Sequence, residues 1–169
     1  MELMEAIRTR RSIRKYEDKP ISKEMVREIL DAAMMAPSAG NAQPWQFVVV
    51  DDHKILDGMV DMHPHIKMVA QAQLGVVVCG DLGLEKFPGY WVQDCAAAMQ
   101  NLLLAIHAQG LGAVWTGIYP MEDRVAAFKE LFNMPEQVVP LGFVPIGWPA
   151  QQLNSTSRFK EDRVHYNSF

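Results

Sequence analysis

A basic segment near the N-terminus contains the residues best suited to bind an anion. Five of the eight residues from Arg8 to Lys15 are arginine or lysine, and Ser12 stands among them. A guanidinium donates two parallel hydrogen bonds to a phosphate, and a hydroxyl adds a short donor. The whole chain is acidic, with a formal net charge of -4. A basic segment in an acidic chain indicates a local anionic ligand, such as a phosphorylated cofactor. A solvated charge run at the end of the first helix is the alternative.

A loop bracketed by two prolines, residues 37–44, is a second candidate binding element. Its polar side chains supply donors and acceptors: Ser38, Asn41 and Gln43. Ala39 and Gly40 allow a ligand to approach the backbone closely. Amide side chains can read the edge of a heteroaromatic ring because they donate and accept side by side. An ordinary connection between a helix and a strand is the alternative.

Two further stretches could contribute to the same site. In residues 112–117 the aromatic Trp115 stands among small residues, and it is either beside a flat ligand or in the core. The C-terminal tail holds a second basic cluster: Arg158, Lys160 and Arg163. If the tail lies on the body of the protein, these cations reach the same anion as Arg10 and Arg14. Otherwise the tail is a solubilising end.

Regular elements must position these candidates. Apolar periodicity predicts helices at residues 2–8, 53–62, 90–109 and 120–132, and a further helix that is capped by Ser22 and ended by Pro37. Strands are predicted at residues 45–50, 74–79, 113–116 and 138–146. Gly110 and Gly112 are expected to end the long helix in the left-handed conformation.

The helix expected at residues 90–109 is unusually apolar. From Phe87 to Met121 the only formal charge is Asp94, and the helix has a narrow polar stripe: Gln93, Asp94, Gln100, Asn101 and His107. A surface helix normally carries a broad charged face, and large exposed apolar patches are rare. The pattern predicts that a second subunit covers this helix in a two-fold homodimer. Burial of the helix inside a monomer is the alternative.

Composition narrows the class of protein. A chain of 169 residues with 49% hydrophobic and 21% charged residues is expected to form one globular domain, residues 1–169, with residues 148–169 as a C-terminal arm. The acidic balance argues against non-specific nucleic-acid binding, and no apolar run reaches membrane-spanning length. Cys79 and Cys95 lack metal-ligand spacing. We expect buried free thiols, no metal site and a cytoplasmic location.

Taken in their order along the chain, the sequence motifs resemble those of the FMN-dependent nitroreductase family. The resemblance covers nearly the whole chain and is carried by residues 10–16, 37–45, 110–117 and 145–149. It implies an α+β fold: a three-layer α-β-α nitroreductase-like arrangement with a mixed, mainly antiparallel sheet and a long central helix at the dimer interface. It also implies an intertwined homodimer with two FMN molecules at the interface and a tail that wraps onto the partner.

The resemblance also implies a role for individual residues. The FMN phosphate and ribityl chain would be held by Arg10, Arg11, Ser12 and Arg14, with Arg158 and Lys160 completing the phosphate site. Residues of the proline-bracketed loop would come from the other subunit: Pro37, Ser38 and Ala39 along the flavin, with Asn41 and Gln43 at the loop's polar positions. The isoalloxazine would be lined by Trp115, Thr116 and Gly117.

The implied activity is that of an NAD(P)H-dependent FMN oxidoreductase. NADH or NADPH would reduce the flavin, and a nitroaromatic, quinone or similar small molecule would then accept the electrons in a ping-pong cycle. The chain has no dinucleotide-binding glycine fingerprint, so the donor would bind transiently over the flavin. No side chain is assigned a catalytic role, and substrate choice is expected in residues 64–73 and 82–89. A flavin-binding or flavin-delivery module without substantial turnover is the alternative, and a dimeric interaction protein without a cofactor is a third hypothesis.

Overall fold

The computed structural model of the chain describes residues 1–62 and 65–169. The helices are α1 (Leu3–Thr9), α2 (Lys23–Met34), α3 (His53–Gly58), α4 (Trp91–Ala108) and α5 (Glu122–Leu131). The strands are β1 (Tyr16–Glu17), β2 (Trp45–Val50), β3 (Leu74–Asp81), β4 (Gly112–Ala113), β5 (Thr116–Gly117) and β6 (Val138–Pro149). Short 3-10 turns are η1 (Ala39–Asn41), η2 (Lys67–Gln71) and η3 (Glu161–Arg163).

The strands form one sheet in which β6 occupies the central position. The described strands follow the order β1-β6-β3-β2, and β4 and β5 also pair with β6. All of these ladders are antiparallel, and a parallel bridge joins Ser12 to Ala113. Residues 74–80 of β3 are all buried, because helices cover both faces of the sheet.

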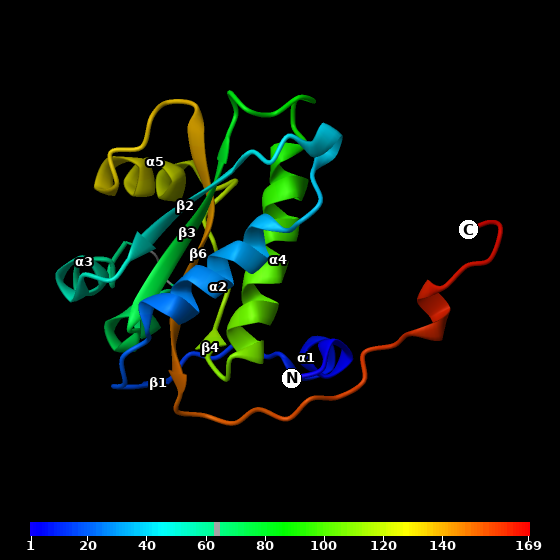
Figure 1. Ribbon diagram of the computed structural model, residues 1–169. Coiled ribbons are helices and arrows are strands. Elements are labelled where there is room, and N and C mark those ends of the chain that lie inside the picture. Colours follow the sequence, from blue (N-terminus) through cyan, green and yellow to red (C-terminus); the bar gives the residue numbers. More distant parts are fainter. Residues whose placement is uncertain (63–64) are drawn as a thin grey trace.

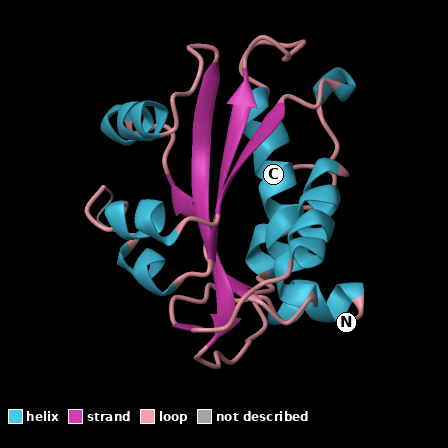
Figure 2. Ribbon diagram, turned by 60° about the vertical axis from the view of Figure 1, so that its left-hand side comes forward, coloured by secondary structure: helices cyan, strands magenta, loops and turns pink. Residues whose placement is uncertain are grey.

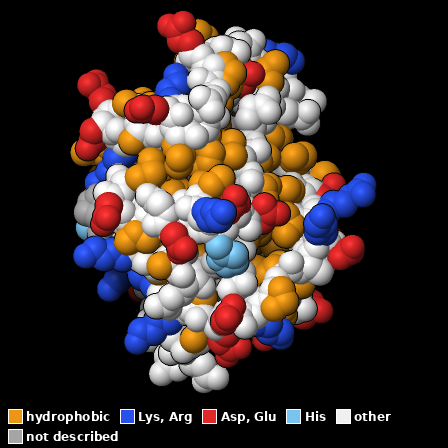
Figure 3. All heavy atoms as spheres, turned by 90° about the vertical axis from the view of Figure 1, so that its left-hand side faces the viewer, with side chains coloured by type: hydrophobic (Ala, Val, Ile, Leu, Met, Phe, Trp, Pro, Cys, Tyr) orange, Lys and Arg blue, Asp and Glu red, His pale blue; other side chains and the backbone are white. Residues whose placement is uncertain are grey.

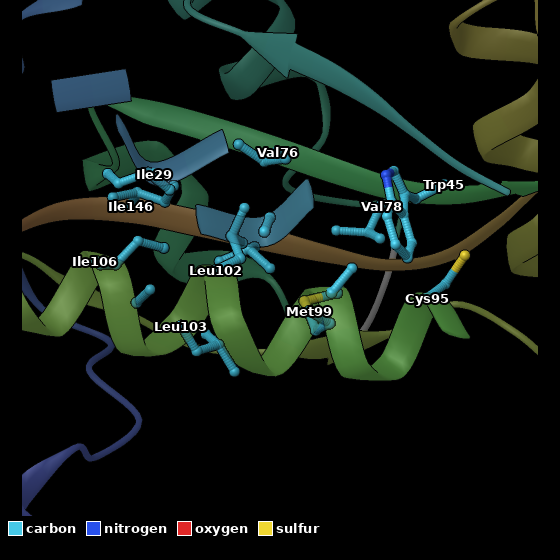
Figure 4. Close-up of a cluster of buried hydrophobic side chains, with 14 of the residues drawn as sticks. Ile29, Trp45, Val76, Val78, Cys95, Met99, Leu102, Leu103, Ile106 and Ile146 are labelled. Carbon is cyan, nitrogen blue, oxygen red and sulfur yellow. The ribbon is translucent and has the colours of Figure 1, made fainter. Parts of the chain in front are cut away.

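Helices lie on both sides of the sheet and make a three-layer molecule (Figures 1 and 2). One core lies between the sheet and the pair α2 and α4, and a second core lies under α3, η2 and α5. In Figure 4, Leu102 and Ile106 of α4 point toward the sheet, where Val76 and Ile146 lie. These contacts confirm the expected α+β arrangement, with its mainly antiparallel sheet and long helix. On the α3 and α5 side, Figure 3 shows an area of apolar side chains with charged groups around it.

Burial along α4 follows the helical period closely. Residues that face the sheet and α2 are buried: Trp91, Cys95, Ala98, Met99, Leu102, Leu103 and Ile106. The residues of the polar stripe do not all lie on the exposed face of α4. Asp94 is 5% exposed and accepts a hydrogen bond from the amide of Ala39, while Asn101 Nδ2 donates to the carbonyl of Ala32 at 3.2 Å. Part of the stripe therefore stabilises contacts within the chain.

Several predicted boundaries need correction at the short strands. The strand expected at residues 113–116 is two short strands, because Val114 and Trp115 interrupt the pairing with β6. Pro145 of β6 lies opposite this interruption and has no backbone N–H to donate. β6 itself continues to Pro149, and it pairs with β1, a short strand that was not predicted. Trp148 thus belongs to the sheet and not to the arm.

Helix ends agree better with their sequence signals. The Ser22 side chain accepts from the amide of Met25, which confirms the predicted N-cap. Gly110 has φ +80 and ends α4 as expected. Gly112 is instead the first residue of β4.

The C-terminal segment leaves the body of the protein after β6. Residues 152–169 are exposed, and their only described regular element is η3. Figure 1 shows this segment running past α1 and away from the sheet. The predicted region 64–73 begins outside the described residues at Pro64, and its remainder contains η2.

The structure also shows where the two cysteines lie and whether a described helix could span a membrane. Cys79 and Cys95 are buried free thiols, and burial raises the pKa of each to about 12. Among the described helices, none is long and apolar enough to cross a membrane.

Candidate functional site

The segment from Arg10 to Arg14 is held against the edge of the sheet. It leaves the C-terminal end of α1 in an extended conformation at Arg10. The amide of Ile13 donates to the carbonyl of Ala113 at 2.9 Å, and Ser12 bridges to the same residue. The Ile13 side chain packs closely on Gly112.

Arg11 is used largely to fix the local backbone. Its Nη1 donates to the carbonyls of Arg8 at 3.1 Å and Arg10 at 2.7 Å. Its Nε donates to the carbonyl of Asn154 at 3.3 Å, so the same guanidinium ties the C-terminal segment to α1. Cations at a helix C-terminus also suit the negative end of the helix dipole. Arg11 therefore joins the two ends of the chain at this site.

A hollow of about 520 Å³ lies between the arginines and the C-terminal segment. We call it the arginine pocket; it is lined by Ile7, Arg8, Arg10, Arg11, Ser155, Thr156, Ser157 and Arg158. The pKa of Arg10 is lowered by burial first, and then by the charges of Arg11 and Arg158. No residue of this lining is acidic. Several guanidiniums and hydroxyls that share a hollow without a carboxylate form a donor set that suits a phosphate.

A second hollow, of about 450 Å³, has Arg14 of the arginine segment in its lining. We call it the tryptophan groove; it is lined by Arg14, His65, Lys67, Met68, Val114, Trp115, Thr116, Gly117 and Arg124. The Trp115 side chain is 39% exposed, so it is not the core residue of the alternative interpretation. A Cβ built on Gly117 would meet nothing within 4 Å, which leaves space for a ligand against this backbone. The Thr116 hydroxyl donates a hydrogen bond to the carbonyl of Phe143 at 2.7 Å.

The arginine segment connects the two hollows. Arg10 lines the arginine pocket and Arg14 lines the tryptophan groove. Four extended residue steps span about 13 Å. An elongated ligand with an anionic end and a flat end fits this arrangement, and FMN has both. The donor set and the open groove backbone thus fit the cofactor that the sequence pointed to.

The proline-bracketed loop lies away from both hollows within one chain. It packs at the N-terminal end of α4, where the amide of Ala39 donates to Asp94 Oδ1 at 2.9 Å, whereas α1 lies near the other end (Figure 1). Its backbone is tightly turned, with positive φ at Gly40, Asn41 and Gln43, and Ser38 Oγ accepts from the amide of Gln43 at 2.9 Å. None of Pro37, Ser38, Ala39, Asn41 and Gln43 lines the arginine pocket or the tryptophan groove. Their predicted role beside the flavin needs a second copy of the chain.

The tail cations differ in their positions. Arg158 lines the arginine pocket with Arg10, and its assignment to the phosphate site stays a prediction. Lys160 lines neither hollow and lies beside η3. Its assignment to the phosphate site stays a prediction.

Five residues of the groove were not predicted as individual site residues: His65, Lys67, Met68, Val114 and Arg124. Lys67 falls in the region where substrate choice was expected. Arg124 comes from α5, and its Nη1 donates to the carbonyl of Gly117 at 3.1 Å. The sequence gives no local signal for Arg124, because its place in the groove depends on how α5 packs on the sheet.

His107 lies next to the arginine segment and was expected at the subunit interface. Its Nε2 is 2.8 Å from Thr9 Oγ1. Since that hydroxyl donates its hydrogen to the carbonyl of Glu5, it accepts a hydrogen bond from the Nε2–H of His107. The pKa of His107 is lowered by burial first and then by Arg10 and Arg11. This histidine thus joins α4 to α1 within the chain.

Comparison with known proteins identifies the family. A protein-family model described as the Nitroreductase family matches residues 7–75 and 67–148 of this chain. The chain belongs to the nitroreductase family. It is therefore an oxidoreductase of the nitroreductase type, and its three-layer fold is the nitroreductase fold.

Individual relatives of this nitroreductase-family chain extend over almost its whole length. A protein of Methanothermobacter thermautotrophicus, provisionally named NADH dehydrogenase/NAD(P)H nitroreductase, is 50% identical over 98% of this chain and 86% of its own. A crystal structure from Bacteroides thetaiotaomicron with the same provisional name has a TM-score of 0.94 and 41% identity, covering 99% of this chain and 98% of that one. A provisionally named nitroreductase of Desulfovibrio desulfuricans, solved in complex with FMN, has a TM-score of 0.85 and 32% identity, covering 100% of this chain and 98% of that one.

Proposed function

We propose that this nitroreductase-family chain is an FMN-dependent oxidoreductase that passes electrons from NADH or NADPH to a nitroaromatic, a quinone or a similar small acceptor. The observation that supports it most directly is the pair of hollows joined by Arg10 and Arg14, one cationic and one beside exposed Trp115. When bound, FMN supplies the redox chemistry, taking a hydride from the nicotinamide and giving two electrons to the acceptor. The residues of the chain bind and orient it.

Each part of the site has its own physical task. Arg10 and Arg158 neutralise the phosphate, while Arg11 holds the chain ends that form the pocket. Trp115 and the backbone at Gly117 flank the flat ring, and Arg14 places a positive charge beside it. The groove is open to solvent on one side, so donor and acceptor enter the same space in turn. That sharing predicts ping-pong kinetics, and no side chain is needed as an acid or base.

We further propose that residues 1–169 form one domain that works as a homodimer. Large apolar side chains are exposed at α1, at the end of α2, in the loop before α4 and in the C-terminal arm: Leu3, Met4, Met35, Phe87, Tyr90 and Phe159. A single subunit rarely exposes so much apolar surface, and a second copy would cover it. The same copy would bring the loop at residues 37–44 to the flavin. Light scattering of the purified protein measures this directly, and a monomer at micromolar concentration would contradict it.

An absorbance spectrum of the purified protein, before and after anaerobic NADH or NADPH, tests the function. Flavin bands that bleach with the donor and return with a nitroaromatic or quinone support the oxidoreductase. Bands that do not bleach with either donor favour the alternative, a flavin-delivery module. A colourless protein that takes up no added FMN would overturn both.

A paired ligand comparison tests the phosphate assignment. FMN and riboflavin differ only by the phosphate, so wild-type protein should bind FMN far more tightly than riboflavin. The double variant Arg10→Ala/Arg158→Ala should lose most of that difference, because it removes the two cations that are assigned to the phosphate. Stoichiometric FMN retained by the double variant would remove the phosphate assignment.

A further inference from the structure

The tryptophan groove is positively charged although the protein is acidic. Its described lining includes Arg14, Lys67 and Arg124, and none of its members is a carboxylate. The net charge of the chain is -4, so this local excess is not a consequence of composition. The two acidic residues beside Arg124 in sequence, Glu122 and Asp123, are exposed in the first turn of α5 and do not line the groove.

Arg124 is held in place with most of its donors free to serve a ligand. Its Nη1 donates to the carbonyl of Gly117 at 3.1 Å, which fixes the guanidinium beside the backbone of the groove. A guanidinium has five N–H donors in a planar fork, and one such contact leaves the others available. Because the side chain is already oriented, little further rotamer freedom is lost when it binds an anion.

Lys67 brings a second charge from a different part of the fold. It is exposed at the first residue of η2, which leads into β3, whereas Arg124 belongs to α5. In the part of the chain that the structure describes, no carboxylate lies within ion-pair distance of Lys67. An ammonium on a flexible stem can follow an anionic group over a range of positions.

We propose that Lys67 and Arg124 bind an anionic group of the substrate, a carboxylate, sulfonate or phosphate, while its ring lies beside Trp115. This inference rests on the proposed function, in which Arg14 is occupied by FMN and only these two cations remain for the substrate. The anion has two chemical sources. It is either an acidic substituent on the aromatic acceptor or the 2′-phosphate that distinguishes NADPH from NADH.

Binding of redox-inert ligands gives the first test, without turnover. Calorimetry on the oxidised, FMN-loaded protein would compare benzoate with the uncharged benzyl alcohol. Wild-type protein should prefer benzoate, and Lys67→Gln and Arg124→Gln should each reduce that preference by about three- to tenfold. The preference should also fall with added salt, since the groove is open to solvent. Equal binding of the two ligands by the wild type would overturn the acceptor source.

Steady-state kinetics separate the two sources of the anion. One ratio compares kcat/KM for 4-nitrobenzoate and 4-nitrobenzyl alcohol, and the other compares NADPH with NADH. A fall in the first ratio in Lys67→Gln and Arg124→Gln assigns the anion to the acceptor, and a fall in the second assigns it to the donor phosphate. If neither ratio changes in either variant, the inference is wrong.

A matched variant and an apoprotein measurement complete the design. Lys23→Gln removes one positive charge at the start of α2, on the other side of the sheet, and should leave both ratios unchanged. An equal change in Lys23→Gln would show that net charge, and not the groove, sets the preference. If the protein binds no FMN, the proposed function fails, and benzoate calorimetry on the apoprotein still shows whether Lys67 and Arg124 hold an anion.

Discussion

The substitution Gly112→Ala tests how the arginine segment is positioned. A Cβ at residue 112 would lie 2.7 Å from Ile13 Cγ2 and 2.8 Å from Ile13 Cβ. Carbon atoms do not approach this closely, so the backbone at Ile13 must move away from β4. That movement strains the hydrogen bond from the Ile13 amide to the carbonyl of Ala113. Arg10 and Arg14, on either side of Ile13, would then lose their relative placement.

The expected cost comes from two opposing effects. Overpacking a close contact costs about 1–3 kcal/mol. Replacing glycine restricts the unfolded chain and returns about 0.5–1 kcal/mol, since Gly112 has no left-handed φ to lose. The midpoints of these two ranges give a net loss of about 1 kcal/mol in the free energy of unfolding. For a chain of this size the Tm should fall by about 2–4 °C.

Urea unfolding and FMN titration measure the two consequences of Gly112→Ala separately. Both are run at one protomer concentration, because dimerisation makes stability depend on concentration. Gly58→Ala is the matched control: a Cβ there meets nothing within 4 Å, so FMN affinity should not change. A Gly112→Ala protein with wild-type stability and wild-type FMN affinity would refute the reasoning.

Three further predictions follow from the contacts around the site. Asp94→Ala should lower the free energy of unfolding by about 1–3 kcal/mol by leaving the Ala39 amide unpaired. Asp94→Asn should cost less, because the amide oxygen can still accept from Ala39 and the buried carboxylate, whose Oδ2 has no partner among the described residues, is removed. Equal losses of the free energy of unfolding in urea for the two variants would contradict this. The pKa of His107 is lowered in the folded protein, so at a pH near the ordinary histidine pKa the unfolded chain binds more protons than the folded one. Taking the pH from about 7.5 to about 5.5 should therefore destabilise the wild type more than His107→Gln, and equal losses would exclude His107 as the cause. Arg158→Ala should weaken FMN binding by about tenfold in a fluorescence titration. Arg163 lines neither hollow, so Arg163→Ala should leave FMN binding unchanged.

Local patterns in the sequence were sufficient for the main elements. The strand at residues 45–50 and the helix at 90–109 were placed to within about one residue, and Ser22 was recognised as a cap. These features depend on neighbours within one or two turns of the chain. The same is true of the basic segment, whose residue types alone suggest an anion.

Features that depend on distant pairing were missed or placed wrongly. The two-residue strand β1 exists because β6 runs beside it, and the break between β4 and β5 lies opposite Pro145. Asp94 was predicted only as part of a polar stripe, but it is buried, and the proline-bracketed loop donates a hydrogen bond to it. In each case a contact between residues far apart in sequence overrode the local pattern.

The sequence determined which chemical groups are available: arginines for a phosphate, an aromatic residue among small ones for a flat ring, and a tail with further cations. Only the tertiary structure decided how they combine. It placed Arg158 beside Arg10, set Arg124 and Lys67 around Trp115, and kept the loop at residues 37–44 away from both hollows of its own chain. The physical reason is that residue type and spacing fix local conformation, whereas a binding site is made by side chains that meet only when helices and strands pack.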